Sequence, residues 1–307
     1  MTGTGHEELL EELRPQAFAI AYRMLGSVAE AEDVVQEALL CLHRALEGGE
    51  RIDSPPAYLA TVTTRLAINE LRSARARRES YVGEWLPEPI ITDGRDDPAL
   101  HAELADSLSL ALLVVLESLT PEQRAVLLLR DVFDYSYAEI ARIVDKSPDN
   151  VRQMATRARC QVEEGRPRFE ATDEHREVLA RRFIEAAEWG DLAGLEAVLA
   201  ADVRLSGDGG GKVPALARTI AGRARVASTL GAWVRQMMRV PDLSLRGTEV
   251  NGAPGILILD GRERLFSVWA LDIAGGEIVG IDAIVNPDKL RHLGPVADYE
   301  ELRRSRE

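Results

Sequence analysis

The chain has 307 residues and a formal net charge of -14 at pH 7, and at roughly 100–200 residues per domain this length leaves room for two or three domains. Hydrophobic residues make up 46% and charged residues 29%, a composition that is typical of folded globular proteins and excludes wholesale disorder. No run approaches the roughly 18 apolar residues of a membrane span, and the N-terminus is acidic where a signal peptide is basic, so we expect a cytoplasmic protein with no membrane contact. The only cysteines, Cys41 and Cys160, are far apart in sequence, and we expect neither a disulfide framework nor a metal or cofactor.

Residues 6 to 165 repeat apolar side chains at spacings of three and four, which predicts an all-α region. In the helix expected from about 29 to 46, one apolar stripe should face a core: Val35, Ala38, Leu39, Leu42 and Leu46. The opposite face carries a polar set with one apolar member: Asp33, Gln36, Glu37 and Leu40. Both a solvated surface with one exposed leucine and a docking face fit this pattern.

The next helix begins after Pro55 and Pro56, and arginines gather towards its far end. Two interpretations fit the basic and aromatic residues of this helix. They form either a solvated face, or a surface that binds DNA phosphates together with an unstacked base. Those residues are Tyr58, Arg65, Arg72, Arg75, Arg77 and Arg78. Because the whole chain is acidic, we expect the free protein to bind DNA weakly and to need a partner that holds it there.

After a proline-containing acidic linker over residues 81–102, the pattern of a helix-turn-helix follows. A first helix is expected over Tyr137–Val144, and Ser147 is a good N-cap for a second helix with Pro148 in its first turn. The second helix would turn a polar face outward, with side chains that suit base edges and phosphates in a major groove. This face holds Arg152, Gln153, Thr156, Arg157 and Arg159. A generic amphipathic hairpin is the alternative.

The last third changes character. Helices are expected from about 174 to 199 and from about 222 to 238, and then short strand-like runs, separated by glycine or proline turns, predict an antiparallel sheet. We therefore divide the chain into a helical domain (1–80), the linker (81–102), a helix-turn-helix domain (103–168), an α+β domain (169–286) and a tail (287–307). The glycine run DGGGK at 208–212 lacks the remaining residues of a phosphate-binding Walker loop, so we interpret it as a flexible turn.

The segments AEDVVQEAL, PPAYLATVTTRLAINELRSARARR and LTPEQRAVLLLRDVFDYSYAEIARIVDKSPDNVRQMATRAR, in this order, resemble the extracytoplasmic-function (group IV) sigma factors of bacterial RNA polymerase. WLPEP at 85–89, DGGGK at 208–212 and NPDKL at 286–290 further resemble the subgroup with a fused SnoaL-like domain. The resemblance implies two all-α domains, sigma regions 2 and 4, followed by an α+β cone of the SnoaL-like (nuclear transport factor 2-like) type.

By this resemblance, Asp33, Gln36, Glu37 and Leu40 would bind core RNA polymerase, whose β and β′ subunits are the expected partners. The loop from Gly48 to Ser54 and the arginine-rich helix would engage the minus-10 promoter element, and the helix after Ser147 would engage the minus-35 element. The fused domain would regulate these activities in cis through Asp208, Gly209, Gly210, Gly211 and Lys212 and through Asn286, Pro287, Asp288, Lys289 and Leu290. Tyr58, Arg65 and Asp145 depart from the residues usual in the family (tryptophan, asparagine and glycine), so the promoter preference does not transfer.

An acid paired with a histidine would be needed for catalysis of the SnoaL type. The histidines after residue 170 are His175 and His292, both outside the expected body of the cone. We therefore expect no enzyme activity, although SnoaL-like domains also include enzymes and binders of small ligands. The alternatives left open are a SnoaL-type enzyme, or a small-molecule-sensing DNA-binding regulator with a ligand in the pocket of the cone.

Overall fold

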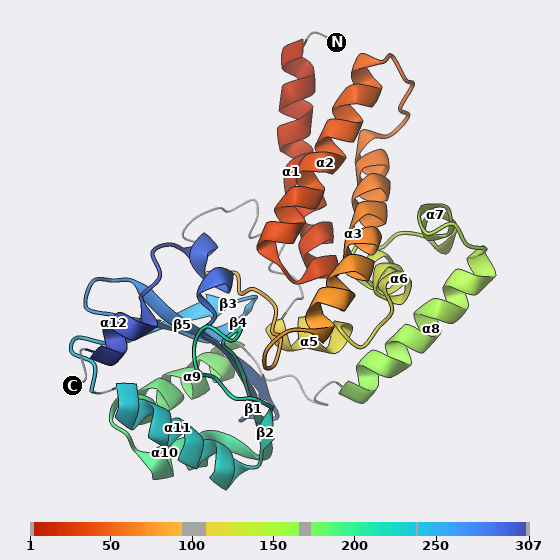
Figure 1. Cartoon of the computed structure of the whole chain (residues 1–307). Coiled ribbons are helices and arrows are strands. Elements are labelled where there is room, and N and C mark those ends of the chain that lie inside the picture. The colour runs from red at the N-terminus through yellow and green to blue at the C-terminus, as the bar shows by residue number, and fades with distance from the viewer. Residues whose placement is uncertain (1–2, 94–108, 166–172, 238, 305–307) are drawn as a thin grey trace. The chain divides into compact units, whose positions relative to one another are not determined.

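The computed structural model describes residues 3–93, 109–165, 173–237 and 239–304, and the chain forms two compact units (Figure 1). The first, called here the helical unit, combines Met1–Glu79 with Leu113–Arg166. The second, called here the sheet unit, combines Ser80–Arg95 and Leu108–Leu112 with Pro167–Glu307. The first part of the linker, residues 81–93, therefore packs with the C-terminal domain, an arrangement that the sequence pattern did not predict.

The helical unit begins with three long helices, α1 (Gly3–Leu25), α2 (Val28–Glu47) and α3 (Pro55–Glu79), which pack against one another. They are followed in the chain by α5 (Leu110–Leu116), whose first residues, up to Leu112, group with the sheet unit, and by α6 (Pro121–Asp131), α7 (Tyr137–Ile143) and α8 (Pro148–Gly165). Two of these helices start at a capping box, in which the side chains of Thr120 and Ser136 each accept a hydrogen bond from the backbone of the third helical residue. The all-α prediction for this part of the chain is confirmed.

The helix-turn-helix is also present, formed by α7 and α8. Ser147 accepts a hydrogen bond from the backbone N–H of Asn150 at 3.3 Å, as expected of an N-cap. Asp145 has a φ of 54°, in the left-handed region that aspartate tolerates better than most residues. The turn therefore forms without the glycine that the family usually has there.

The sheet unit contains one sheet of six strands in the order β2-β1-β6-β5-β4-β3. In chain order the strands are β1 (Leu199–Asp208), β2 (Ile220–Ala221), β3 (Ser244–Val250), β4 (Ala253–Leu259), β5 (Leu265–Ala274) and β6 (Glu277–Ile284). The expectation of an antiparallel sheet was wrong for one pair, because β1 runs parallel to β6. A parallel neighbour needs a long connection, and here the chain between the two strands includes a helix and four other strands.

Strand β1 was missed by the sequence analysis, which placed its beginning in a helix. Its sequence LAADVRLSGD contains two alanines and two aspartates, which have weak strand preference, so its period is hard to recognise. The sequence analysis expected one helix before β1, but the structure has two, α9 (Asp173–Glu188) and α10 (Leu192–Val198). Gly190, which lies between them, has a φ of 63°.

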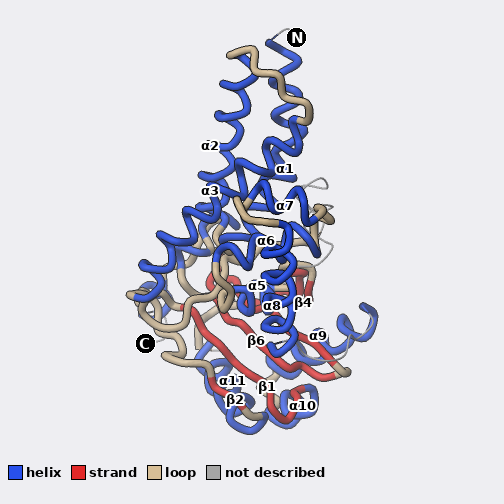
Figure 2. Tube along the Cα trace, turned by 90° about the vertical axis from the view of Figure 1, so that its right-hand side faces the viewer, coloured by secondary structure: helices blue, strands red, loops and turns tan. Residues whose placement is uncertain are grey.

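Helices α9, α10 and α11 (Arg223–Met237) pack against one face of the sheet (Figure 2). The interior between them is apolar, and its largest side chains are aromatic. Phe183 meets Trp269 edge-on at 6.4 Å between ring centroids, and Trp233 lies 6.0 Å from Trp269.

The sheet unit ends in two short 3-10 helices, η1 (Pro287–Lys289) and η2 (Arg291–Leu293), and in helix α12 (Tyr299–Arg304). None of the helices in the described ranges is long and apolar enough to cross a membrane.

Candidate functional site

The expected polymerase contact lies on the outer face of α2. Asp33, Gln36 and Glu37 are exposed, and Leu40 among them keeps 38% of its surface exposed. On the opposite side Val35, Ala38 and Leu42 are fully buried, so the helix is fixed in this orientation by its own core stripe. An acidic rim around one exposed leucine is therefore displayed to solvent, as a docking face requires.

The outer face of α8 is mostly open. Arg152, Gln153, Thr156 and Arg157 are exposed. Arg159 is half-buried, and its Nε donates to Asp131 of α6 at 2.9 Å, a hydrogen bond that raises the pKa of the guanidinium. Arg152 also pairs with a protein carboxylate, that of Asp149 on the same helix at 2.5 Å, so two of the three arginines on this face are bonded within the protein.

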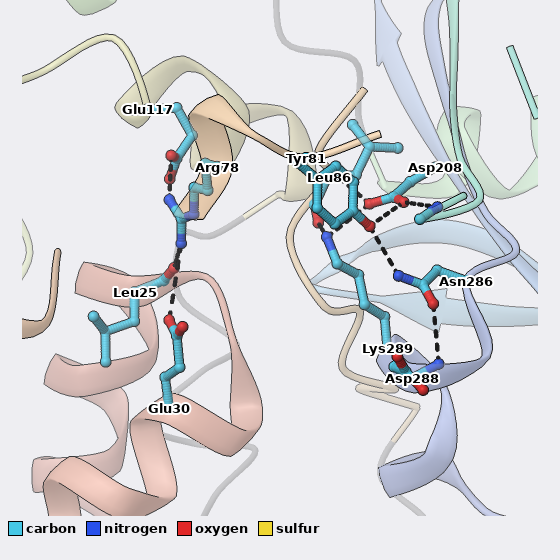
Figure 3. A network of polar contacts seen from close by, with 11 residues as sticks. Leu25, Glu30, Arg78, Tyr81, Leu86, Glu117, Asp208, Asn286, Asp288 and Lys289 are labelled. Carbon is cyan, nitrogen blue, oxygen red and sulfur yellow. Dashed lines mark hydrogen bonds and ion pairs between the residues drawn. The ribbon is translucent and has the colours of Figure 1, made fainter. Parts of the chain in front are cut away.

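The arginines of α3 are largely occupied. Arg65 donates from Nε to the carbonyl oxygen of Ile143 at 2.9 Å and from a terminal nitrogen to that of Arg142 at 2.8 Å. Arg72 pairs with Glu122, and Arg78 pairs with Glu117 (Figure 3). These arginines face the second helical domain, which spacing along one helix could not reveal.

The remaining candidates on α3 are less occupied or lie outside the described side chains. Tyr58 is half-buried, and burial raises the pKa of its hydroxyl, with a further contribution from Glu50. Arg75 and Arg77 belong to the same helix, but their side chains are outside the part of the chain that the structure describes.

In the sheet unit, the three short motifs meet at a buried aspartate. The carboxylate of Asp208, at the end of β1, accepts hydrogen bonds from the Tyr81 hydroxyl at 2.6 Å, from the backbone N–H of Leu86 at 2.9 Å and from that of Gly210 at 3.0 Å. Lys289 lies 2.7 Å from the same carboxylate, and their side chains are 7% and 0% exposed. This set of Tyr81, Leu86, Asp208, Asn286 and Lys289 is called here the linker anchor (Figure 3).

The other members complete the linker anchor. Lys289 also donates to the carbonyl oxygen of Leu86, and its ammonium lies 4.1 Å from the ring centroid of Trp85, a distance suited to a cation–π contact. The Asn286 amide donates to the Tyr81 hydroxyl at 2.8 Å. Burial and the hydrogen bond to Asp208 raise the pKa of Tyr81, so the hydroxyl stays protonated.

Two glycines of the DGGGK loop are required by this packing. A Cβ on Gly209 would lie 2.0 Å from the carbonyl oxygen of Val213. Gly210 has a φ of 58°, and a Cβ there would lie 2.3 Å from the Asn286 amide nitrogen and 3.0 Å from the Tyr81 hydroxyl. The loop therefore needs glycine because the linker and the NPDKL segment approach its backbone closely.

The loop is not arranged to bind phosphate. The backbone N–H groups of Lys212 and Val213 both donate to the carbonyl oxygen of Gly209, and that of Gly210 donates to Asp208. The Lys212 side chain pairs with Asp288 at the surface. These internal bonds agree with the prediction of a turn.

The linker continues across the sheet unit to the edge strand β3. His292 is hydrogen-bonded to the carbonyl oxygen of Pro89 at 2.8 Å. Further along, Thr92 donates its backbone N–H to Glu249 at 2.8 Å, and Ile90 exchanges bonds of 3.0 and 2.9 Å with the side chain and backbone of Asn251. Residues 81–93, called here the strap, are thus held at both ends.

The sequence analysis named one side of the linker anchor and missed the other. The structure brings Asp208 to Lys212 and Asn286 to Leu290 together, with Leu290 fully buried, whereas the sequence analysis named them only as regulatory residues. Tyr81 and Leu86 were not singled out as site residues. The sequence signal that could have identified them is the apolar and aromatic content of YVGEWLP, which is unusual for an exposed linker.

The interior between the sheet and its helices is apolar. Its buried cluster consists of apolar and aromatic side chains, and no group of three metal-ligating side chains is found in the described ranges. Asp272 and Asp282 are neighbours on β5 and β6, and burial raises the pKa of both, that of Asp282 to about 7. No histidine is among the groups that shift these values.

Comparisons with known proteins agree with this geometry. Residues 9–77 match the family model described as Sigma-70 region 2, and residues 109–161 match the model described as Sigma-70, region 4. The chain is 36% identical over 293 residues to the ECF RNA polymerase sigma factor SigJ of Mycobacterium tuberculosis, covering 91% of each chain. It is 34% identical over 277 residues to the probable ECF RNA polymerase sigma factor SigI of the same species, covering 88% of this chain and 90% of that one.

A solved structure extends the similarity to the sheet unit. The crystal structure of M. tuberculosis SigJ superposes with a TM-score of 0.75 at 32% identity, covering 92% of this chain and 98% of that one. The resemblance inferred from the motifs, including the SnoaL-like domain, is confirmed. The chain belongs to the extracytoplasmic-function sigma factors of RNA polymerase.

Proposed function

We propose that this chain binds the core RNA polymerase in the cytoplasm through the outer face of α2, and that it directs the enzyme to promoters without catalysing a reaction itself. The exposed acids Asp33 and Glu37 with Leu40 between them support the docking role. The loop before α3 and the arginines of α3 would contact the minus-10 element. The open face of α8 would enter the major groove at the minus-35 element.

The observation that carries the regulatory part is the linker anchor. The strap joins the two helical domains in sequence, and a buried ion pair with several hydrogen bonds holds it on the SnoaL-like domain. Moving the strap requires exposing or separating these groups, which is costly because buried charges lose their compensation. The SnoaL-like domain therefore acts in cis by fixing the path of the linker. A small ligand bound by this domain stays a prediction.

A pull-down with purified core polymerase tests the docking face. Replacing Asp33 and Glu37 together by alanine should reduce recovery of the polymerase at least tenfold. A control with the same change of charge replaces Glu11 and Glu12, which are exposed on α1. Equal recovery for the two double variants would contradict the assignment of the docking face.

Run-off transcription tests the regulatory role. Full-length protein is compared with the chain truncated near Arg168 and with the full-length Lys289→Met variant. If the anchor controls the linker, the point variant should shift transcription in the same direction as the truncation. Unchanged transcription in both would contradict regulation in cis.

A further inference from the structure

The helical unit contains a second set of polar contacts, separate from the linker anchor. At the end of α1, the carbonyl oxygen of Leu25 accepts from Arg78 at 2.6 Å, and that of Met24 accepts from Arg124 at 2.7 Å. Glu117 pairs with both arginines, and its carboxylate lies 2.8 Å from Arg124. Arg78 comes from the first helical domain and Arg124 from the second, so these bonds join the two domains.

Two more arginines of α3 extend this contact. Arg65 donates to the last carbonyl groups of α7, at the helix end where the backbone dipole favours a cation. Arg72 pairs with Glu122 in the first turn of α6, and this pairing lowers the pKa of Glu122 against the opposing effect of burial. Thus every α3 arginine whose side chain is described here bonds to the second helical domain.

These partners resemble what DNA would offer. A guanidinium presents a fixed fork of donors that suits carboxylate and phosphate oxygens equally well. The same donors cannot serve both at once. Arg65, Arg72 and Arg78, the α3 arginines with described side chains, are therefore already bonded to protein oxygens.

We propose that Arg65, Arg72 and Arg78 form a latch that keeps the two helical domains closed on each other and withholds these arginines from DNA until phosphates replace their protein partners. This latch rests on the proposed function and adds a step to it, in which promoter binding competes with a contact inside the sigma factor.

The latch is graded. Arg72 is 58% exposed, and exposed ion pairs are weak and screened by salt, so this end should open readily. Arg78 is only 14% exposed, which makes it the firm end of the latch. Arg65 stands where the family usually has asparagine, whose short amide cannot supply the two guanidinium hydrogen bonds seen here.

The test uses Glu122→Gln, which removes the charged partner of Arg72 and leaves every arginine in place. The two native cysteines, Cys41 on α2 and Cys160 on α8, lie one in each helical domain and can carry spin labels for a distance measurement in the full chain. We expect Glu122→Gln to broaden the Cys41–Cys160 distance distribution towards longer values. Binding of labelled promoter DNA, measured by fluorescence anisotropy, should tighten roughly three- to tenfold.

A matched control separates the latch from a general effect of charge. Glu163→Gln removes the same charge from an exposed position on α8, outside the latch, and should leave the distance distribution unchanged. Arg65→Asn provides a second opening variant, and thermal unfolding by circular dichroism shows whether each variant is folded.

The outcomes are distinct. Distance distributions that stay unchanged in both Glu122→Gln and Arg65→Asn would overturn the latch. Longer distances without tighter DNA binding by Glu122→Gln would overturn the claim that the latch withholds the arginines from DNA. Failure of the proposed function shows separately, as loss of the dependence of polymerase recovery on Asp33 and Glu37.

Discussion

Replacing Lys289 by methionine should be the most damaging single change in the linker anchor. Methionine keeps most of the apolar stem but removes the ammonium group. The carboxylate of Asp208 would stay buried with its three neutral donors, from Tyr81, Leu86 and Gly210, and without a positive partner. The carbonyl oxygen of Leu86 would also lose a donor.

Removing one partner of a buried ion pair typically costs about 3–5 kcal/mol. The remaining hydrogen bonds compensate part of the charge of Asp208, so we expect a loss near the lower end, about 3 kcal/mol. The pair of Lys212 and Asp288 is the internal control, since these side chains are 52% and 42% exposed. Lys212→Met should cost at most about 1 kcal/mol because an exposed pair is worth little.

The assay is chemical unfolding followed by tryptophan fluorescence. The four tryptophans, Trp85, Trp189, Trp233 and Trp269, all belong to the sheet unit, so the signal reports on this unit alone. Adding Asp208→Asn to Lys289→Met should recover part of the loss, because the double variant no longer buries an unpaired charge. Equal losses for Lys289→Met and Lys212→Met would refute this account of the linker anchor.

Three further predictions concern the sheet unit and the DNA contact. Gly210→Ala should destabilise the sheet unit by at least about 2 kcal/mol more than Gly275→Ala in the same assay, because both glycines have positive φ but only at Gly210 would a Cβ meet other atoms; equal effects would contradict the close approach of Asn286 and Tyr81. Since burial raises the pKa of Asp282 from 3.8 to about 7, with like charges on Asp272 and Glu84 adding to the effect, the folded state holds its proton longer than the unfolded state. The unfolding free energy contributed by this group therefore falls as the pH rises from about 4 to about 7, by up to about 1.4 kcal/mol per unit, and is constant above; unfolding at several pH values should show that Asp282→Asn removes this slope, and a slope equal to that of the wild type would exclude Asp282 as its source. The free chain, with its net charge of -14, should bind promoter DNA weakly and with strong salt dependence in anisotropy titrations, whereas tight binding at moderate salt would contradict the electrostatic argument.

The sequence was sufficient for the elements whose signals are local. The cap at Ser147 and the core stripe of α8 predicted the helix-turn-helix, because capping and apolar period depend on neighbouring residues. The exposed face of α2 was predicted for the same reason. Strand β1 was missed because its parallel partner β6 lies about 80 positions later and its own residues have weak strand preference.

The contacts of the candidate sites were beyond the reach of spacing arguments. That Asp208 is fully buried depends on Tyr81 and Lys289, which come from segments far before and after it. Likewise, the sequence of α3 gives no sign that Arg65 donates hydrogen bonds to the carbonyl oxygens at the end of α7. Helical period places a side chain on a face, but the identity of the neighbour on that face is a property of tertiary packing.

The order of synthesis gives the strap one more consequence. Tyr81 and Asn286, which bond to each other, are 205 positions apart. At a translation rate of about 5–20 residues per second, Asn286 follows Tyr81 by roughly 10–40 s. Every newly made copy therefore passes through a period in which both promoter-binding domains exist while the restraint on the segment between them has not yet been made. A chain released early from the ribosome in this interval would carry both helical domains but lack the contacts that hold the strap.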